Sequence, residues 1–121
     1  MTNTPIGYLR RKRFLPHERL AIFRQTQGRC GYCGVTLGDK WQIDHMRPLA
    51  CGGTNDLVNL IAACPPCNNL KHCDTLEEYR HRIENQIPRL HMNSVNFRTA
   101  LRFGLVQETQ VPVKFYFEGQ S

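Results

Sequence analysis

Four cysteines in two closely spaced pairs are the residues of this chain whose spacing most directly predicts chemistry. Cys30-Gly-Tyr-Cys33 and Cys64-Pro-Pro-Cys67 each separate two thiols by two residues. That spacing lets one tight turn present both thiolates to a tetrahedral zinc ion. Four thiolates leave no open coordination position, so the expected Zn²⁺ is structural. If both pairs bind one ion, residues 34–63 become a loop clamped at its base.

Inside this loop and just beyond it lie residues that could hydrolyse a phosphodiester. Asp44 supplies a carboxylate and Asn68 an amide oxygen, the hard ligands that suit Mg²⁺ or Mn²⁺. His45 belongs to the residue type that titrates near neutral pH and can take a proton from water. Asn59 could hydrogen-bond backbone groups across the loop and hold His45 in place. Lys71, one turn beyond Asn68, could meet a phosphate.

Each of these residues also has a purely structural interpretation. An Asp-His pair at a strand end is common, Asn59 could merely close a turn, and Asn68 could cap a helix. Adjacent strand residues point to opposite faces. We therefore expect the strand to end at about residue 44, so that Asp44 and His45 can face one phosphate. The joint spacing, and not any single residue, carries the prediction.

The elements that must position these residues follow from hydrophobic pattern and turn signals. A helix is predicted from Pro16 towards Gly28, and a short strand over residues 41–44 is followed by a return strand over 57–61. The prolines between Cys64 and Cys67 favour a helix that starts at about 65–67, because proline suits the first turn of a helix.

Beyond the cysteine pairs the sequence predicts a helical and strand extension over residues 76–121. Thr75 and Glu78 form a capping box for a helix that runs to about Ile87. Ser94 can cap a second helix through Phe103. Residues 111–118 alternate between apolar and polar, which predicts a strand, and Pro112 restricts it to a sheet edge or a strand start.

Composition and charge narrow the class of protein. The 121 residues are predicted to form one domain, and Lys+Arg 16 against Asp+Glu 10 gives a net charge of +6, which favours a polyanionic partner, nucleic acid before a membrane surface. A basic but non-specific surface is the alternative. The polar N-terminus shows no secretory leader and no long apolar run is present, so we expect a cytoplasmic protein of bacterial or phage type with no membrane partner. Cys51 and Cys73 are then expected to be reduced thiols, although a disulfide between them stays open.

The segment CGYC, followed by IDHMRPLACGGTNDLVNLIAACPPCNNLK, closely resembles the HNH endonucleases of the ββα-metal class. The resemblance covers about residues 28–75. It implies an α+β fold: a ββα-metal (HNH) core stapled by a four-cysteine zinc, with flanking helices and a C-terminal edge strand. It also implies one catalytic divalent ion, Mg²⁺ or Mn²⁺, held by Asp44 and Asn68. His45 would be the general base and Asn59 the residue that buttresses the hairpin.

The function predicted from these observations is metal-dependent DNA endonuclease, nicking one strand per active site, with double-stranded DNA as partner and a monomer or homodimer as the assembly. The alternative is a non-catalytic zinc module that binds nucleic acid, and an RNA substrate is a third possibility. Phosphate contacts are expected from Arg47, Lys71 and a basic arm over residues 1–14, whose densest cluster is Arg10, Arg11, Lys12 and Arg13. That arm could equally be only solvated.

Overall fold

The computed structural model describes residues 10 and 12–119. The helices and strands follow in the order α1 (Pro16–Gln25), β1 (Gln42–His45), β2 (Leu60–Ala63), α2 (Pro65–Lys71), α3 (Leu76–Glu84), α4 (Gln86–Asn93) and α5 (Val95–Arg102). Short 3₁₀ turns lie at Leu49–Cys51, Leu57–Asn59 and Tyr116–Gly119. Helices combined with one small sheet make the described part of the chain α+β, as predicted.

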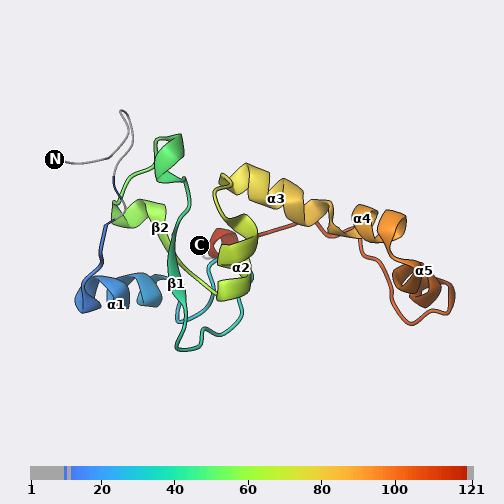
Figure 1. Ribbon diagram of the computed structural model, residues 1–121. Helices are drawn as coiled ribbons and strands as arrows, with labels where there is room; N and C mark the ends of the chain where they lie inside the picture. The colour runs from blue at the N-terminus through green and yellow to red at the C-terminus, as the bar shows by residue number, and fades with distance from the viewer. Residues whose placement is uncertain (1–9, 11, 120–121) are drawn as a thin grey trace.

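The centre of the molecule is an antiparallel hairpin followed directly by a helix (Figure 1). β1 pairs with β2 in the register Gln42↔Ala63 to His45↔Leu60, and α2 packs against β1. β1 ends at His45, one residue beyond the predicted end at about residue 44, because His45 is still paired with Leu60. The return strand begins three residues later than predicted, since Leu57–Asn59 forms a 3₁₀ turn first.

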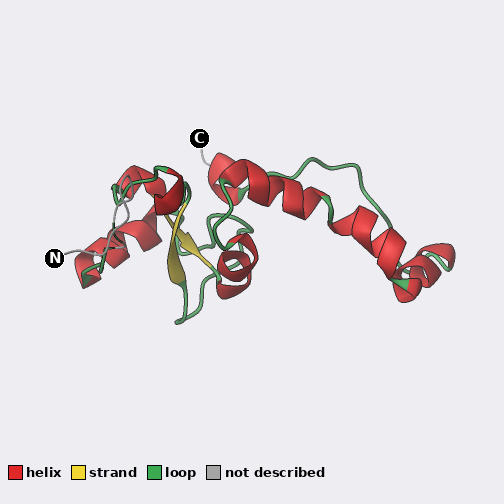
Figure 2. Cartoon of the chain, turned by 45° about the horizontal axis from the view of Figure 1, so that its top comes forward, coloured by secondary structure: helices red, strands yellow, loops and turns green. Residues whose placement is uncertain are grey.

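The two faces of the hairpin are covered by different parts of the chain. On one face, Ile22 of α1 packs with Ile43, Leu60 and Ala62. On the other, Ile61 and Ala63 pack with the zinc-site cysteines and with an aromatic cluster made of Tyr32, Tyr79 and Phe115. The hairpin is therefore buried on both sides although it has only two strands. Figure 2 shows the strands between α1 and α2.

Two glycines shape the first cysteine turn. A Cβ on Gly31 would lie 2.0 Å from Cδ1 of Ile61, and Gly34 has a φ of +81°. Only a residue without a side chain fits so close to β2. The backbone N–H of Gly31 donates to the Ala62 carbonyl over 2.8 Å, which fixes this turn against the hairpin.

The helical extension differs from the prediction in its middle. The Thr75–Glu78 capping box is present and begins α3, and Ser94 caps α5 through the Phe97 N–H. However, α3 ends at Glu84 and a separate helix, α4, follows. Pro88 explains the break, because its ring has no N–H to donate and would clash with the carbonyl of Glu84 in a continuous helix. We call residues 86–104, which hold α4 and α5, the helical arm. It extends away from the hairpin (Figures 1 and 2).

The predicted C-terminal edge strand over residues 111–118 is wrong. The chain there has no strand and ends in the 3₁₀ turn Tyr116–Gly119. Two backbone bonds join it to the first cysteine turn, from Tyr116 N–H to Tyr32 O and from Phe117 N–H to Gly31 O. The alternation matches burial only in part, since Phe115 is buried whereas Val111, on the same predicted face, is 74% exposed.

Among residues 10 and 12–119, no helix has both the length and the apolar character needed to cross a membrane.

Candidate functional site

The four paired cysteines meet at one point, as their spacing predicts. The sulfur atoms of Cys30, Cys33, Cys64 and Cys67 all lie within 4.8 Å of one another, and the Cys33 and Cys64 sulfurs are 3.7 Å apart. Tetrahedral zinc with Zn–S bonds of about 2.3 Å places its sulfurs at about this separation. The donors therefore fit a structural Zn²⁺. Cys51 and Cys73 are exposed free thiols outside this cluster.

Protons within the sulfur cluster are unevenly shared. A hydrogen bond with Cys67 lowers the pKa of Cys30 to about 4, and the same contact raises the pKa of Cys67. Burial raises the pKa of Cys64 to about 11. Metal binding requires deprotonated thiols, so a divalent cation would replace the protons of this cluster.

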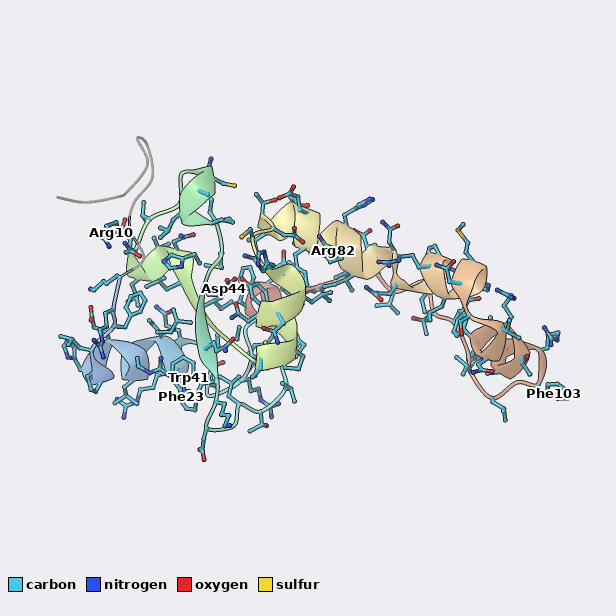
Figure 3. All side chains as sticks on the ribbon, viewed as in Figure 1. Arg10, Phe23, Trp41, Asp44, Arg82 and Phe103 are labelled. Carbon is cyan, nitrogen blue, oxygen red and sulfur yellow. The ribbon has the colours of Figure 1, made fainter. Side chains whose placement is uncertain are left out.

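Asp44 points from β1 towards α2 and is already engaged there (Figure 3). Its Oδ2 accepts a 2.6 Å hydrogen bond from the Tyr32 hydroxyl and lies 2.9 Å from Lys71 Nζ. Burial, followed by the charge of Asp44, raises the pKa of Tyr32, so the phenol stays protonated and donates. Asp44 is 8% exposed, and one of its oxygens serves the interior of the protein.

The expectation that Lys71 meets a phosphate is contradicted by its position. Lys71 is fully buried, at 0% exposure, and its Nζ donates to the backbone carbonyl of His45 over 3.0 Å besides pairing with Asp44. A charged side chain is stable in the interior only when it is paired and hydrogen-bonded. Lys71 is therefore a positioning residue that ties α2 to the end of β1.

His45 leaves β1 on the opposite face from Asp44. Its Nε2 is 2.8 Å from the Oδ1 of Asn55, and the Asn55 Nδ2 donates to the carbonyl of Arg10 over 2.9 Å. Because a carbonyl can only accept, Asn55 must present its oxygen to the imidazole. In the neutral ring Nε2 then carries the proton and Nδ1 is the basic nitrogen.

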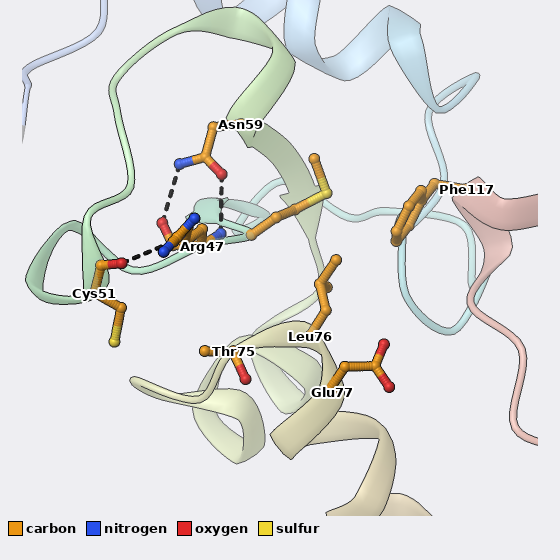
Figure 4. Close-up of a pocket in the computed structure, with 8 residues that line it drawn as sticks. Arg47, Cys51, Asn59, Thr75, Leu76, Glu77 and Phe117 are labelled. Carbon is orange, nitrogen blue, oxygen red and sulfur yellow. Dashed lines mark hydrogen bonds between the residues drawn. The ribbon is translucent and has the colours of Figure 1, made fainter.

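Asn59 holds the loop that follows His45, as predicted for it. Its Oδ1 accepts from the Arg47 N–H over 2.9 Å, and its Nδ2 donates to the carbonyls of Arg47 and Thr54. Figure 4 shows the bonds to Arg47. Gly53 lies so close that a Cβ there would be 1.9 Å from the Arg47 carbonyl oxygen. The loop is thus closed by backbone contacts, and the Arg47 side chain donates to the Cys51 carbonyl.

Asn68 lies in α2 with its amide fixed by Gln42. The Asn68 Nδ2 donates to the Gln42 Oε1 over 2.5 Å. Gln42 precedes Asp44 by two residues and so shares its face of β1. The structure therefore brings Asp44, Asn68 and Lys71 to one junction of strand and helix, while the His45 ring lies on the other side of the strand end.

The N-terminal basic cluster is described only in part. Arg10 and Arg13 are exposed, and Lys12 forms an ion pair with Glu18. Arg11 lies outside the described residues. Arg10 contributes its backbone carbonyl to Asn55, so this segment lies beside His45.

A cavity of about 540 Å³ opens beside the loop, between Arg47, Asn59 and the start of α3 (Figure 4). Asp44, His45 and Asn68 do not line it. Of the predicted site residues, Arg47 and Asn59 line this cavity.

Comparison with known proteins agrees with this geometry. Residues 30–74 match the family model described as HNH endonuclease, and this span includes Asp44, His45, Asn59 and Asn68. No curated protein matches the chain. Among solved structures, the type II-C Cas9 enzyme from Actinomyces naeslundii is similar in fold, with a TM-score of 0.50 and 24% identity. The match covers 76% of this chain and 11% of the Cas9 chain.

Three residues of the site have no signal in the sequence that we recognised. Tyr32 lies between two zinc-binding cysteines and looked like a spacer, Gln42 looked like an ordinary strand residue, and Asn55 looked like part of a turn. Gln42 could have been found from the strand period, since it precedes Asp44 by two residues. The contacts of Tyr32 and Asn55 depend on segments distant in sequence.

Proposed function

We propose that this chain is a metal-dependent DNA endonuclease that nicks one strand at the end of β1. The observation that supports this most is the family match over residues 30–74, together with the placement of His45 at the last position of β1. The positive net charge supports nucleic acid as the partner. The cysteine cluster suits a structural zinc and a reducing compartment such as the cytoplasm.

His45 acts as the general base in this proposal. Its Nε2–H is held by Asn55, which leaves Nδ1 to accept a proton from the attacking water. Asn59 and Lys71 are positioning residues: the first closes the loop after His45, and the second holds the His45 carbonyl. Two neighbouring strand residues have Cα atoms about 3.8 Å apart. A phosphate that crosses the strand end can therefore meet groups from both faces.

Asp44 and Asn68 would hold the divalent cation. Asp44 uses Oδ2 for Tyr32 and Lys71, and we assign its other oxygen to the cation; Asn68 uses its Nδ2 for Gln42, which leaves its amide oxygen as a donor. Two protein oxygens suit Mg²⁺ or Mn²⁺, ions that keep several waters. When bound, such an ion neutralises charge on the phosphoryl and leaving oxygens. Arg47 and the N-terminal basic residues would contact neighbouring phosphates.

The products of this proposal carry 5′-phosphate and 3′-hydroxyl ends, as the family resemblance implies. The described residues hold one such site, so we expect it to nick one strand, and a double-strand cut requires two such sites or two visits. Double-stranded DNA is the substrate that we favour. Cleavage of matched DNA and RNA duplexes distinguishes this substrate from RNA.

The decisive experiment is relaxation of supercoiled plasmid in Mg²⁺ or Mn²⁺. Loss of a positioned base lowers rates by about 10²–10⁴-fold, so His45→Ala should reduce nicking by at least about 10²-fold. His81→Ala is the matched control, because His81 is exposed on α3 and distant in sequence from the site. Nicking by His45→Ala at the wild-type rate would refute the assignment.

A non-catalytic zinc module that binds nucleic acid is the second candidate. It is favoured by one observation: the Asp44 carboxylate already has a buried cation partner in Lys71. Titration with Mn²⁺ after zinc loading separates the two functions. A nuclease takes up a second, oxygen-ligated ion that Asn68→Ala weakens, whereas a pure binding module takes up zinc alone.

A further inference from the structure

The helical arm is basic along its whole length. Residues 85–107 contain Arg89, Arg98 and Arg102 but no Asp or Glu. Arg98 and Arg102 are four residues apart in α5 and so share one face of that helix. Other arginines of the extension are neutralised locally, since Arg80 pairs with Glu118 and Arg82 with Asp74. The arm therefore carries three arginines and has no carboxylate within residues 85–107.

The arm is also largely uncovered by the rest of the described chain. Neither α4 nor α5 has a buried residue. Three of its large apolar side chains, and Leu105 directly after it, are between 66% and 78% exposed: Met92, Val95 and Phe103 in the arm, then Leu105. Phe103 lies at the far end of the molecule from the hairpin (Figure 3). Isolated helices of this length, about eight residues, are marginal in water, so a ligand that covers this surface would stabilise it.

The charge of the arm favours nucleic acid over a second copy of this chain as the ligand that covers it. A symmetric dimer apposes the same patch on both subunits. Such an interface would bring arginines together, and the carboxylate that contacts the arm, Glu108, is already paired with His91. The backbone of a nucleic acid offers a phosphate for each guanidinium. Its bases can contact exposed apolar and aromatic side chains.

The position of the arm relative to the hairpin is fixed by α3. Tyr79 is buried in the aromatic cluster, and the Arg80–Glu118 and Arg82–Asp74 pairs hold the helix on both sides. Arg98 Nη1 donates to the carbonyl of His91 and so joins α5 to α4. α3 and α4 hold 9 and 8 residues, which at 1.5 Å per residue span about 25 Å.

We propose that the helical arm is a second DNA-contacting surface, which binds the backbone of the duplex about seven base pairs from the point where α3 begins. The distance follows from about 25 Å of helix and a rise of about 3.4 Å per base pair. Arg89 and Arg102 make the phosphate contacts, and Phe103 and Leu105 lie next to them. This inference rests on the proposed nuclease function, because it assigns the arm to the same substrate.

The test measures binding and not cleavage, so that it stands apart from the nuclease assay. His45→Ala protein is titrated with a labelled duplex of about three helical turns, ~30 base pairs, and the affinity is followed against salt. Arg89→Gln with Arg102→Gln should make the slope of log K against log salt shallower by about 1.8, because each phosphate contact contributes about 0.9. Arg24→Gln with Lys40→Gln removes the same charge from exposed positions outside the arm and should leave the slope unchanged.

Further variants separate lost contact from lost structure. Arg89→Lys with Arg102→Lys keeps both charges and should retain the wild-type slope. Equal slopes for the arm pair and the control pair would overturn the arm's role, even if the wild-type protein nicks plasmid. A dimer in sedimentation that Phe103→Ser dissociates would also overturn it, in favour of a second copy. If His45→Ala nicks normally but the arm slope changes, the catalytic assignment fails and the arm stands.

Discussion

The stapled hairpin and the helical arm are stabilised in opposite ways. In the hairpin, Cys30, Ile61, Ala62, Ala63 and Lys71 have at most 3% of their surface exposed, and among the described residues no buried side-chain nitrogen or oxygen lacks a hydrogen-bond partner. In the arm, neither helix has a buried residue. The contrast indicates that the hairpin is built to hold groups at fixed positions, whereas the arm is built to present a surface.

The two regions are also held in place by different kinds of interaction. The four-cysteine cluster and the buried Lys71–Asp44 ion pair make the hairpin depend on a few residues. The arm depends on α3 and on hydrogen bonds at its ends. Substitutions of the same chemical type should therefore have very different effects in the two regions.

Removal of the zinc site is expected to have the largest effect. Structural zinc supplies about 10–16 kcal/mol of apparent folding free energy in small domains, which exceeds the net stability of most domains. Cys64→Ser should unfold the protein, as measured by circular dichroism, while Cys51→Ser, a change of an exposed thiol outside the cluster, should not. A Cys64→Ser protein with the wild-type melting temperature would show that the sulfurs do not staple the fold.

Removal of the buried lysine is expected to have the next largest effect. Lys71→Met leaves the Asp44 carboxylate buried without its cation, and breaking a buried pair in this way costs about 3–5 kcal/mol. Urea unfolding measures the loss. Adding Asp44→Asn to Lys71→Met should recover part of it, and equal stability of the single and double variants would argue against a coupled pair.

Two phenylalanines give the most direct comparison of the regions. Phe115 is 2% exposed in the aromatic cluster and Phe103 is 76% exposed in the arm. Phe115→Ala should destabilise the protein by about 3–5 kcal/mol, whereas Phe103→Ala should change the free energy of unfolding by less than about 0.5 kcal/mol. Both values come from urea unfolding without DNA, and similar losses would mean that the arm packs on the core in solution.

The smallest expected effect is the loss of the ion pair between Arg80 and Glu118, by mutation or at low pH. Hydrogen bonds from Arg80 lower the pKa of Glu118 below its ordinary value of 4.5. Because the folded state favours the carboxylate, this pair stabilises the protein above that value, and the stabilisation is lost as pH falls through the lowered pKa. Glu118→Gln should cost up to about 1 kcal/mol near neutral pH, as for partly exposed ion pairs. That difference from wild type should vanish in acid below the lowered pKa, and a difference that persists there would contradict it.

Much of the hairpin could be predicted from sequence because its signals are local. The two cysteine pairs, the prolines that begin α2 and the Asp44-His45 step all have short, fixed spacing. The resemblance supplied the order of strands and helix. The assembly of all four cysteines then followed, since each pair already fixed two of the ligands.

The sequence-based predictions failed where contacts between distant segments of the chain determine the structure. Lys71 was interpreted as an exposed cation, because the sequence does not show that Asp44 and Tyr32 lie next to its ammonium group. Residues 111–118 alternate like a strand but have no strand beside them, and two backbone bonds join them to the first cysteine turn. The predicted helix ran to about Ile87, whereas α3 ends at Glu84. The ring of Pro88 would clash with the carbonyl four residues before it, so the helix ends there and not directly before the proline.

The bond from Asn55 to the Arg10 carbonyl has a consequence for any shortened form of the protein. Changing the Arg10 side chain leaves that acceptor in place, whereas a chain that starts at Lys12 lacks it. The Asn55 carboxamide is then free to rotate by half a turn and to offer its NH₂ to the imidazole, which would move the ring proton to Nδ1. Preparations that differ only in their leading residues should therefore differ in which ring nitrogen of His45 carries the proton.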